Sequence, residues 1–202
     1  PTTISLTKGA PRVNLSKGGG RQGPMRVNLN WSAQKPAGGF IAKLSAAVNQ
    51  IDLDLGCLYE LADGSKGVIQ ALGNSFGSLD RPPYIQLEGD DRSGANVHGE
   101  NMHVNLARPE QFRRILVFAM IYQGAPNWAA VDGVVTLFPT SGPQIEVRLD
   151  SAENNARICA VALIESDGRT VSVQREVKYV TGSQVELDKL YGWGMQWKAG
   201  RK

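Results

Sequence analysis

The segment from Ile51 to Leu61 constrains the fold more than any other part of the chain. It places nonpolar side chains at every second position, namely Ile51, Leu53, Leu55, Cys57, Tyr59 and Leu61. Because successive side chains of a β-strand point to opposite faces, all six fall on one face of a strand. The turn residues 62–65 follow, and the segment 67–72 is predicted to return as a hairpin partner.

Further strands are predicted along most of the chain. Residues 25–31 alternate in the same way, and short nonpolar segments bounded by turn residues indicate strands at 114–122, 131–138, 144–149, 158–165 and 170–179. The pair Asp167-Gly168 predicts a hairpin between the last two. This spacing, with many β-branched residues, predicts an all-β fold, a two-sheet antiparallel β-sandwich with few short helices. Only 184–191, after Thr181-Gly182-Ser183, favours a helix.

Three other segments have weaker patterns. Residues 4–9 and 13–18 each carry an alternating triplet that ends in Lys-Gly, and together they predict one hairpin-sized unit of two short strands. Residues 32–49 have no firm periodicity and are predicted to form a long loop. The aromatic segment 193–197 is predicted to form a closing strand.

The length and composition predict a single domain over residues 1–202. A content of 42% hydrophobic and 20% charged residues is typical of a folded chain. No nonpolar run approaches the ~20 residues of a membrane span, and the N-terminus lacks a signal peptide's nonpolar core, so we expect a cytoplasmic protein. Cys57 and Cys159 lie in nonpolar runs and are expected to be reduced, a disulfide between them being the alternative.

The charge is unevenly distributed. Seven of the 22 basic residues precede Asp52, and none of the 19 acidic residues does. These basic residues are Lys8, Arg12, Lys17, Arg21, Arg26, Lys35 and Lys43. They are interpreted either as solvated side chains on one edge of a sandwich or as a surface for nucleic acid, phospholipid or an acidic partner.

Two carboxylates lie close together in the first strand. Asp52 and Asp54 are two residues apart, so they project from the same face, opposite the nonpolar row. Two like charges held together favour binding of a cation, although on an exposed sheet each carboxylate can instead be solvated on its own.

A second acidic segment runs from Glu88 to Asn101. Its glycine-punctuated sequence supplies side-chain oxygens from Asp90, Asp91, Ser93, Asn96, Glu100 and Asn101. Hard oxygen donors on a loop suit calcium, but the spacing does not match an EF-hand, because Ala95 stands where a third donor is needed. The alternative interpretation is a polar surface hairpin.

Enzymatic chemistry finds little support in the sequence. The two imidazoles, His98 in the acidic loop and His103 on an expected strand, could bind zinc with Glu100, but their spacing matches no known zinc motif. Gly18-Gly19-Gly20 lacks the flanking strand and helix of a phosphate-binding loop. We therefore expect a protein that is not an enzyme.

In order along the chain, several segments resemble the TerD family. They are Ile4–Gly9, Val13–Gly19, Val27–Trp31, Asp52-Leu53-Asp54, Gly73-Asn74, the loop Gly89-Asp90-Asp91-Arg92-Ser93-Gly94 and the closing Glu186–Trp197. The resemblance covers nearly the whole chain. Members of that bacterial family are calcium-binding β-sandwiches linked to tellurite resistance and other stress responses, and the resemblance implies the same here.

The resemblance also implies a set of metal ligands. It places calcium contacts at Asp52, Asp54, Asn74, Asp90 and Asp91, with Glu100 as a further candidate. Family members usually continue after the loop with a dense acidic run, whereas this chain has residues 95–101 with few carboxylates. Fewer anionic ligands weaken calcium affinity, so a weak or single site is expected. The basic balance of this chain also departs from the family's acidic character.

Two functions follow from these observations. The first is a calcium-binding, non-enzymatic stress-response protein that acts as a binding or scaffold module. Its protein partners are not identified by the sequence. The alternative is an anion-binding adaptor whose basic N-terminal region contacts nucleic acid or a membrane surface.

Overall fold

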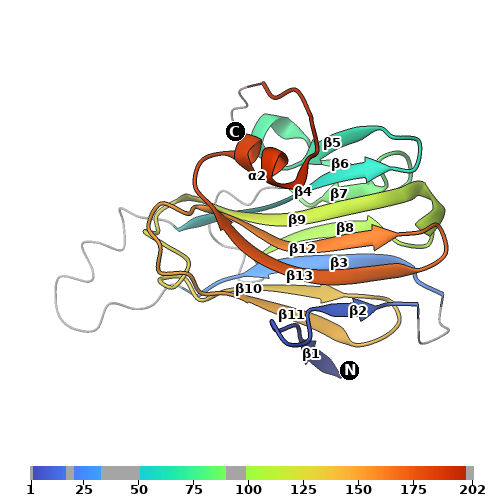
Figure 1. Ribbon diagram of the computed structural model, residues 1–202, viewed down its shortest axis with the longest axis horizontal. Coiled ribbons are helices and arrows are strands. Elements are labelled where there is room, and N and C mark those ends of the chain that lie inside the picture. The colour runs from blue at the N-terminus through green and yellow to red at the C-terminus, as the bar shows by residue number, and fades with distance from the viewer. Residues whose placement is uncertain (1, 17–20, 33–50, 90–98, 199–202) are drawn as a thin grey trace.

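The computed structural model describes residues 2–16, 21–32, 51–89 and 99–198, which form two facing β-sheets (Figure 1). The first sheet contains β1 (Thr3–Ser5), β3 (Pro24–Asn30), β6 (Gly77–Ser78), β7 (Ile85–Leu87), β8 (Glu100–Asn105), β10 (Gly133–Phe138) and β11 (Gln144–Leu149). The second contains β2 (Arg12–Asn14), β4 (Asp52–Leu61), β5 (Lys66–Ile69), β9 (Phe112–Gln123), β12 (Ile158–Ser166) and β13 (Val171–Val180). Within the described residues, the helices are the 3-10 turns η1 (Leu72–Asn74) and η2 (Pro109–Gln111) and the α-helix α2 (Gln184–Tyr191).

The strand order within each sheet differs from the order along the chain. The seven-stranded sheet runs β1-β11-β10-β3-β8-β7-β6, and the six-stranded sheet runs β2-β13-β12-β9-β4-β5. Neighbouring strands are antiparallel except β1 and β11, which are parallel. The predicted β-sandwich is confirmed, as are the hairpins β4–β5 and β12–β13 and the bounds of α2.

The main core lies between the two sheets and follows the predicted alternation. Leu53, Leu55 and Cys57 of β4 are fully buried there, and Val27 and Leu29 of β3 belong to the same nonpolar cluster. Burying nonpolar side chains is the main stabilising contribution to such a fold. Both cysteines are free and buried, as predicted, and burial raises the pKa of each thiol.

The outer face of the six-stranded sheet is also covered. Residues 184–197, here called the C-terminal cover, comprise α2 and the segment that follows it. Leu187 and Trp193 of the cover pack with Leu58, Leu116 and Phe118 in a second buried nonpolar cluster. Strand β4 is therefore buried on both faces. The sequence alternative, in which the face that carries Asp52 and Asp54 is exposed to solvent, is corrected.

The predicted closing strand at residues 193–197 is not formed. The carboxylate of Asp188 instead accepts hydrogen bonds from the backbone N–H groups of Gly194 and Met195, at 2.7 and 2.9 Å, and from the Trp197 indole, at 2.8 Å. These backbone donors are thereby satisfied by a side chain rather than by a neighbouring strand, and the segment folds back against its own helix.

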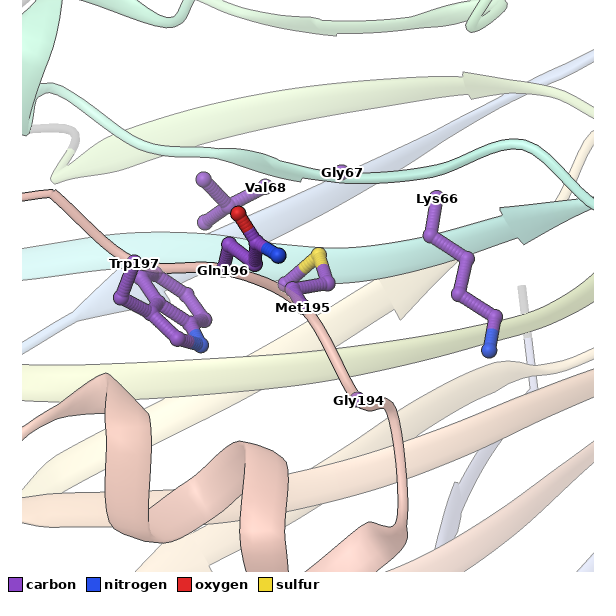
Figure 2. A pocket seen from close by; sticks show the side chains of 7 residues that line it. All are labelled: Lys66, Gly67, Val68, Gly194, Met195, Gln196 and Trp197. Carbon is purple, nitrogen blue, oxygen red and sulfur yellow. The ribbon is translucent and has the colours of Figure 1, made fainter.

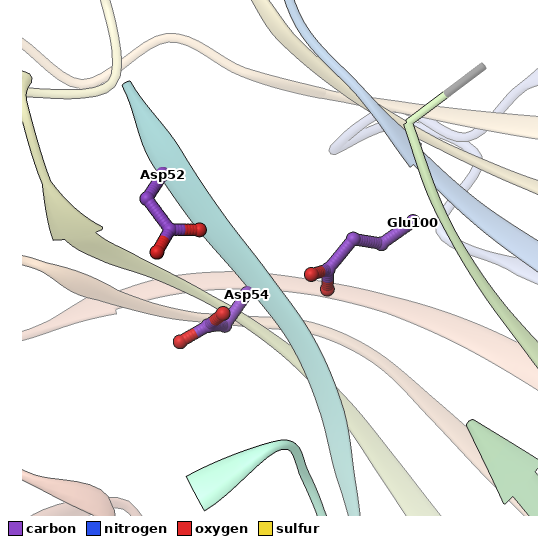
Figure 3. A group of neighbouring side chains, drawn as sticks. All are labelled: Asp52, Asp54 and Glu100. Atoms are coloured by element: carbon purple, nitrogen blue, oxygen red, sulfur yellow. The ribbon is translucent and has the colours of Figure 1, made fainter. Parts of the chain in front are cut away.

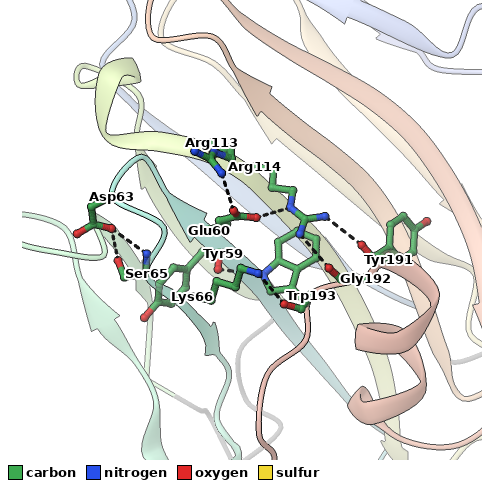
Figure 4. A network of polar contacts seen from close by, with 10 residues as sticks. All are labelled: Tyr59, Glu60, Asp63, Ser65, Lys66, Arg113, Arg114, Tyr191, Gly192 and Trp193. Atoms are coloured by element: carbon green, nitrogen blue, oxygen red, sulfur yellow. Dashed lines mark hydrogen bonds and ion pairs between the residues drawn. The ribbon is translucent and has the colours of Figure 1, made fainter.

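A polar network fixes the C-terminal cover at the point where α2 ends (Figure 4). Glu60 of β4 is buried and pairs with Arg114 at 2.6 Å and with Arg113 at 3.1 Å. Arg114 also donates to the Tyr191 and Gly192 carbonyls at the end of α2 and lies 3.8 Å from the ring centre of Trp193. Burial acts to raise the pKa of Glu60, but the hydrogen bond and charge of Arg114, with Lys66 and Arg113, outweigh it and lower the pKa.

The predicted N-terminal hairpin is wrong, although both of its strands exist. β1 pairs with β11 in one sheet, whereas β2 pairs with β13 in the other. Leu6 and Leu15, which follow these strands, are both buried in the main core. The chain thus crosses from sheet to sheet, and each short strand covers an edge that would otherwise be open.

Other sequence expectations have different outcomes. The short strands β6 and β7 were not predicted, and the long loop at 32–49 lies outside the described residues except for Ser32. Within the described ranges, no helix is long and apolar enough to cross a membrane.

Candidate metal centre

Three carboxylates from two sheets converge at one end of the sandwich. Asp52 and Asp54 come from β4, and Glu100 comes from the first position of β8 (Figure 3). One oxygen from each side chain lies within 4.8 Å of the others. The sequence predicted all three as ligands, and the structure brings them together.

The short length of β5 makes this convergence possible. β5 ends at Ile69, opposite Cys57, so the chain of β4 before Cys57 extends past its partner. On β8, Glu100 has the same phase as the inward-facing Met102 and Val104, and its side chain therefore points toward the other sheet. There its carboxylate accepts a 2.7 Å hydrogen bond from the backbone N–H of Leu55.

A β-bulge shapes the start of β4. Asp52 pairs with Gln123 and Leu53 pairs with Ile121, so Tyr122 is an extra residue on β9 at this point. Bulges redirect neighbouring side chains and increase the local twist. This one lies beside the two aspartates, with Tyr122 exposed on the surface.

Because the cluster is at least partly buried, the repulsion between its carboxylates is poorly screened by water, and a nearby positive charge would stabilise it. Asp54 is only 2% exposed, whereas Asp52 and Glu100 are partly exposed. At 4.8 Å and an effective dielectric constant of about 20, each pair of ionised carboxylates repels by about 3 kcal/mol. A divalent cation among these oxygens would replace that repulsion by attraction, and carboxylate oxygens are donors that hard cations such as calcium and magnesium prefer.

A hydrogen-bond network holds the start of β8. The Asn28 amide donates to the Glu100 carbonyl at 3.3 Å and to the Asn101 side-chain oxygen at 3.0 Å, and Arg26 donates to the same oxygen at 3.1 Å. Asn101 in turn donates to Glu88, which contacts His103 at 2.7 Å. Sequence reasoning gave Asn28 no such role, because only the register pair Asn28–Asn101 brings the two residues together.

The remaining sequence-predicted ligands have different outcomes. Asp90 and Asp91 lie outside the described residues. Glu100 was expected in the acidic loop, but it opens strand β8, because its backbone pairs with Leu29 of β3. Asn74 ends η1, and the chain leaving β5 in the antiparallel β4–β5 pair runs toward the aspartate end of β4. Its role as a ligand stays a prediction.

The histidine alternative for this site is not supported by the geometry of β8. His103 is three residues from Glu100, so the two side chains point to opposite faces of the strand. His103 contacts Glu88 instead. His98, the other imidazole, lies outside the described residues.

Fold and site together define a β-sandwich protein with an acidic centre where the two sheets meet. The chain is 42% identical over 199 residues, 98% of its length, to a tellurium resistance protein TerA from Alcaligenes sp.. A crystal structure of a homologue of the telluride resistance protein TerD from Streptomyces coelicolor A3(2) shares the fold, with a TM-score of 0.53 and 19% identity over 81% of this chain and 94% of that one. No family model matches the chain.

The identity to TerA and the shared fold support the resemblance to the tellurium-resistance family that the sequence motifs predicted. The chain spans 58% of the length of the TerA relative that it matches. The activity and partners of that longer protein are therefore proposals for this chain.

Proposed function

We propose that this protein binds a hard divalent cation, calcium first, and serves as a non-enzymatic binding or scaffold module in a stress response of the tellurium-resistance type. The convergence of Asp52, Asp54 and Glu100 within 4.8 Å supports the cation site. The identity to TerA supports the stress-response role.

The proposed cation would connect the two sheets. Asp52 and Asp54 belong to the six-stranded sheet and Glu100 to the seven-stranded sheet, so an ion held by all three would join β4 to β8. Calcium takes six to eight oxygen ligands, and three side chains leave room for further donors. Asn74, Asp90 and Asp91 are the proposed additional ligands, as the family resemblance implies.

A cation in this position supplies electrostatic cross-linking rather than bond-breaking chemistry. A ligand that binds only the folded state stabilises it by mass action. The surroundings also favour a structural role, because Leu55 donates its backbone N–H to Glu100, and Asn28 and Arg26 hold the adjacent strand. The non-enzymatic assignment is part of the proposal.

Calorimetric calcium titration tests this function. Wild-type protein is expected to bind calcium, and Asp52→Asn and Asp54→Asn are expected to weaken binding at least tenfold, because each removes an anionic ligand. Asp80→Asn is the matched control. Asp80 is exposed in the turn between β6 and β7, at the opposite end of β8 from Glu100. Wild type without calcium uptake, or aspartate variants that bind as wild type does, would contradict the proposal.

The structure supports the anion-binding adaptor less than it supports the cation site, because two of the basic N-terminal residues already contact other side chains. Arg12 pairs with Glu165 at 2.9 Å, and Arg26 lies 3.9 Å from the ring centre of Phe138 while it bonds to Asn101. Lys17, Lys35 and Lys43 lie outside the described residues. Nucleic-acid or membrane binding stays a prediction, which a steep loss of affinity with rising salt would support.

A further inference from the structure

The C-terminal cover and the carboxylate cluster are in contact with the same strand, β4. At one end of β4, Trp193 of the cover donates its indole N–H to the Tyr59 carbonyl at 3.0 Å, and Lys66 of β5 donates to the Trp193 carbonyl at 2.8 Å. Figure 2 shows the segment Gly194–Trp197 beside Lys66–Val68, with a groove between them. The other end of β4 carries Asp52 and Asp54.

The first residue of α2 extends this contact toward the acidic cluster. Gln184 is 8% exposed, and its side-chain NH2 lies 3.8 Å from the sulfur of Met120. Met120 is directly opposite Asp54 in the β4–β9 ladder, so their side chains are neighbours on the same outer face. Gln184 thus packs on the residue beside the most buried carboxylate.

A second contact of Gln184 leads to the loop with the predicted ligand Asn74. Its amide donates a 2.9 Å hydrogen bond to the Gln70 side-chain oxygen. Gln70 exchanges two backbone hydrogen bonds with Ser75, of 3.0 and 3.1 Å, and these close the loop of residues 71–74. Gln184 therefore contacts both Met120, beside Asp54, and Gln70, at the base of the loop that holds Asn74.

The start of α2 is well held. Ser183 and Glu186 form a capping box, in which the Ser183 hydroxyl accepts from Val185 N–H and the Glu186 carboxylate accepts from Ser183 N–H. Such caps stabilise the first helical turn. Gln184 is therefore expected to move together with the helix. Through the hydrogen bonds of Asp188, it is also expected to move with the rest of the cover.

We propose that docking of the C-terminal cover is thermodynamically linked to cation binding at Asp52, Asp54 and Glu100, through Gln184 and its contacts with Met120 and Gln70. The inference rests on the proposed function, because it concerns regulation of the same site. Linkage is reciprocal: a docked cover raises cation affinity, and a bound cation holds the cover more firmly. Gln184 is a positioning residue in this scheme.

Two measurements on the whole chain test the linkage. Calorimetry with calcium is expected to show affinity weakened about fivefold to tenfold in Gln184→Ala, in the range of typical coupling. Gln144→Ala, in β11 of the other sheet, is the matched control and is expected to bind as wild type does. Hydrogen exchange at the amides of residues 184–197 is expected to slow when calcium is added to wild type and to stay unchanged in Asp52→Asn.

The outcomes separate this inference from the proposed function. If wild type binds calcium but exchange in the cover is the same with and without the ion, the linkage is overturned and the cation site stands. If wild type binds no calcium, both are overturned. If exchange in the cover slows with calcium but Gln184→Ala binds calcium as wild type does, the route through Gln184 is overturned.

Discussion

The carboxylate of Glu100 accepts the backbone N–H of Leu55 at 2.7 Å, and this bond joins strand β8 of one sheet to strand β4 of the other. The residues are 45 positions apart in sequence. The same carboxylate lies beside Asp52 and Asp54. One side chain thus both satisfies a backbone donor and completes the acidic cluster.

These two roles of Glu100 can be separated by substitution. In the presence of a chelator, Glu100→Ala is expected to be less stable than Glu100→Gln by about 1–3 kcal/mol, because only glutamine keeps an acceptor for Leu55 N–H. Both variants are expected to lose calcium-dependent stabilisation. Denaturant unfolding with chelator and with calcium measures both effects. Equal stability of the two variants in chelator would show that the Leu55 bond contributes little.

Gly99 should be intolerant of a side chain. Its φ is +71°, and an added Cβ would collide with the backbone carbonyl oxygen of Leu29. Gly99→Ala is therefore expected to destabilise the fold by about 2 kcal/mol, and to weaken calcium binding because Glu100 is the next residue. Gly9→Ala is the control, since Gly9 is not in the left-handed region and a Cβ there meets only the Thr7 hydroxyl, at 4.0 Å. Thermal unfolding and calorimetry compare them, and equal behaviour would contradict the prediction.

Asp188 holds the end of the C-terminal cover. It is 4% exposed and accepts three N–H groups, from Gly194, Met195 and Trp197. Asparagine retains a single acceptor oxygen, so Asp188→Asn is expected to cost about 2–3 kcal/mol and to increase proteolytic cleavage after Gly192.

The control for Asp188 is an exposed aspartate. Asp132 forms a 3.7 Å surface ion pair with Arg148, and Asp132→Asn is expected to change stability by about 0.5 kcal/mol or less. Denaturant unfolding and limited proteolysis provide the comparison. An Asp188→Asn variant as stable and as protease-resistant as Asp132→Asn would be inconsistent with the described contacts.

Asp167 should titrate at an unusually low pH. Hydrogen bonds from the Thr170 N–H, the Thr170 hydroxyl and the Arg169 N–H lower its pKa from 3.8 to about 2. Because folding lowers this pKa, the carboxylate contributes stability above pH 3.8 that is lost as the pH falls toward 2. An NMR titration is expected to give a midpoint near 2, and Thr170→Val should raise it. A wild-type midpoint at 3.8 would refute the assignment.

Local sequence patterns predicted most of the strands but few of their long-range neighbours. The alternation in β4 and the Asp167-Gly168 turn each act over a few residues, so they were visible in the sequence. By contrast, the repeat near the N-terminus suggested a hairpin, whereas β1 and β2 joined different sheets. Strand pairing depends on which edges are left open elsewhere, and no local pattern records that.

The candidate site divides in the same way. The spacing of Asp52 and Asp54 predicted a shared strand face, and the acidic segment 88–101 and the family resemblance added Glu100. The contribution of Asn28 emerged only from the register of β3 against β8. Likewise, sequence reasoning assigned no role to Asp188, because its three N–H donors come from a segment that was predicted to be a strand.

The sequence by itself determined the all-β class, the faces of the strands, the helix at the C-terminus and the oxygen character of the candidate site. These properties follow from periodicity, turn residues and side-chain chemistry, which operate within a few residues. Only the tertiary structure decided that Glu100 crosses to β4, that Asp54 is buried and that the C-terminal cover packs over the same sheet. Those features depend on where β5 ends and how two sheets pack, and packing is a property of the whole chain.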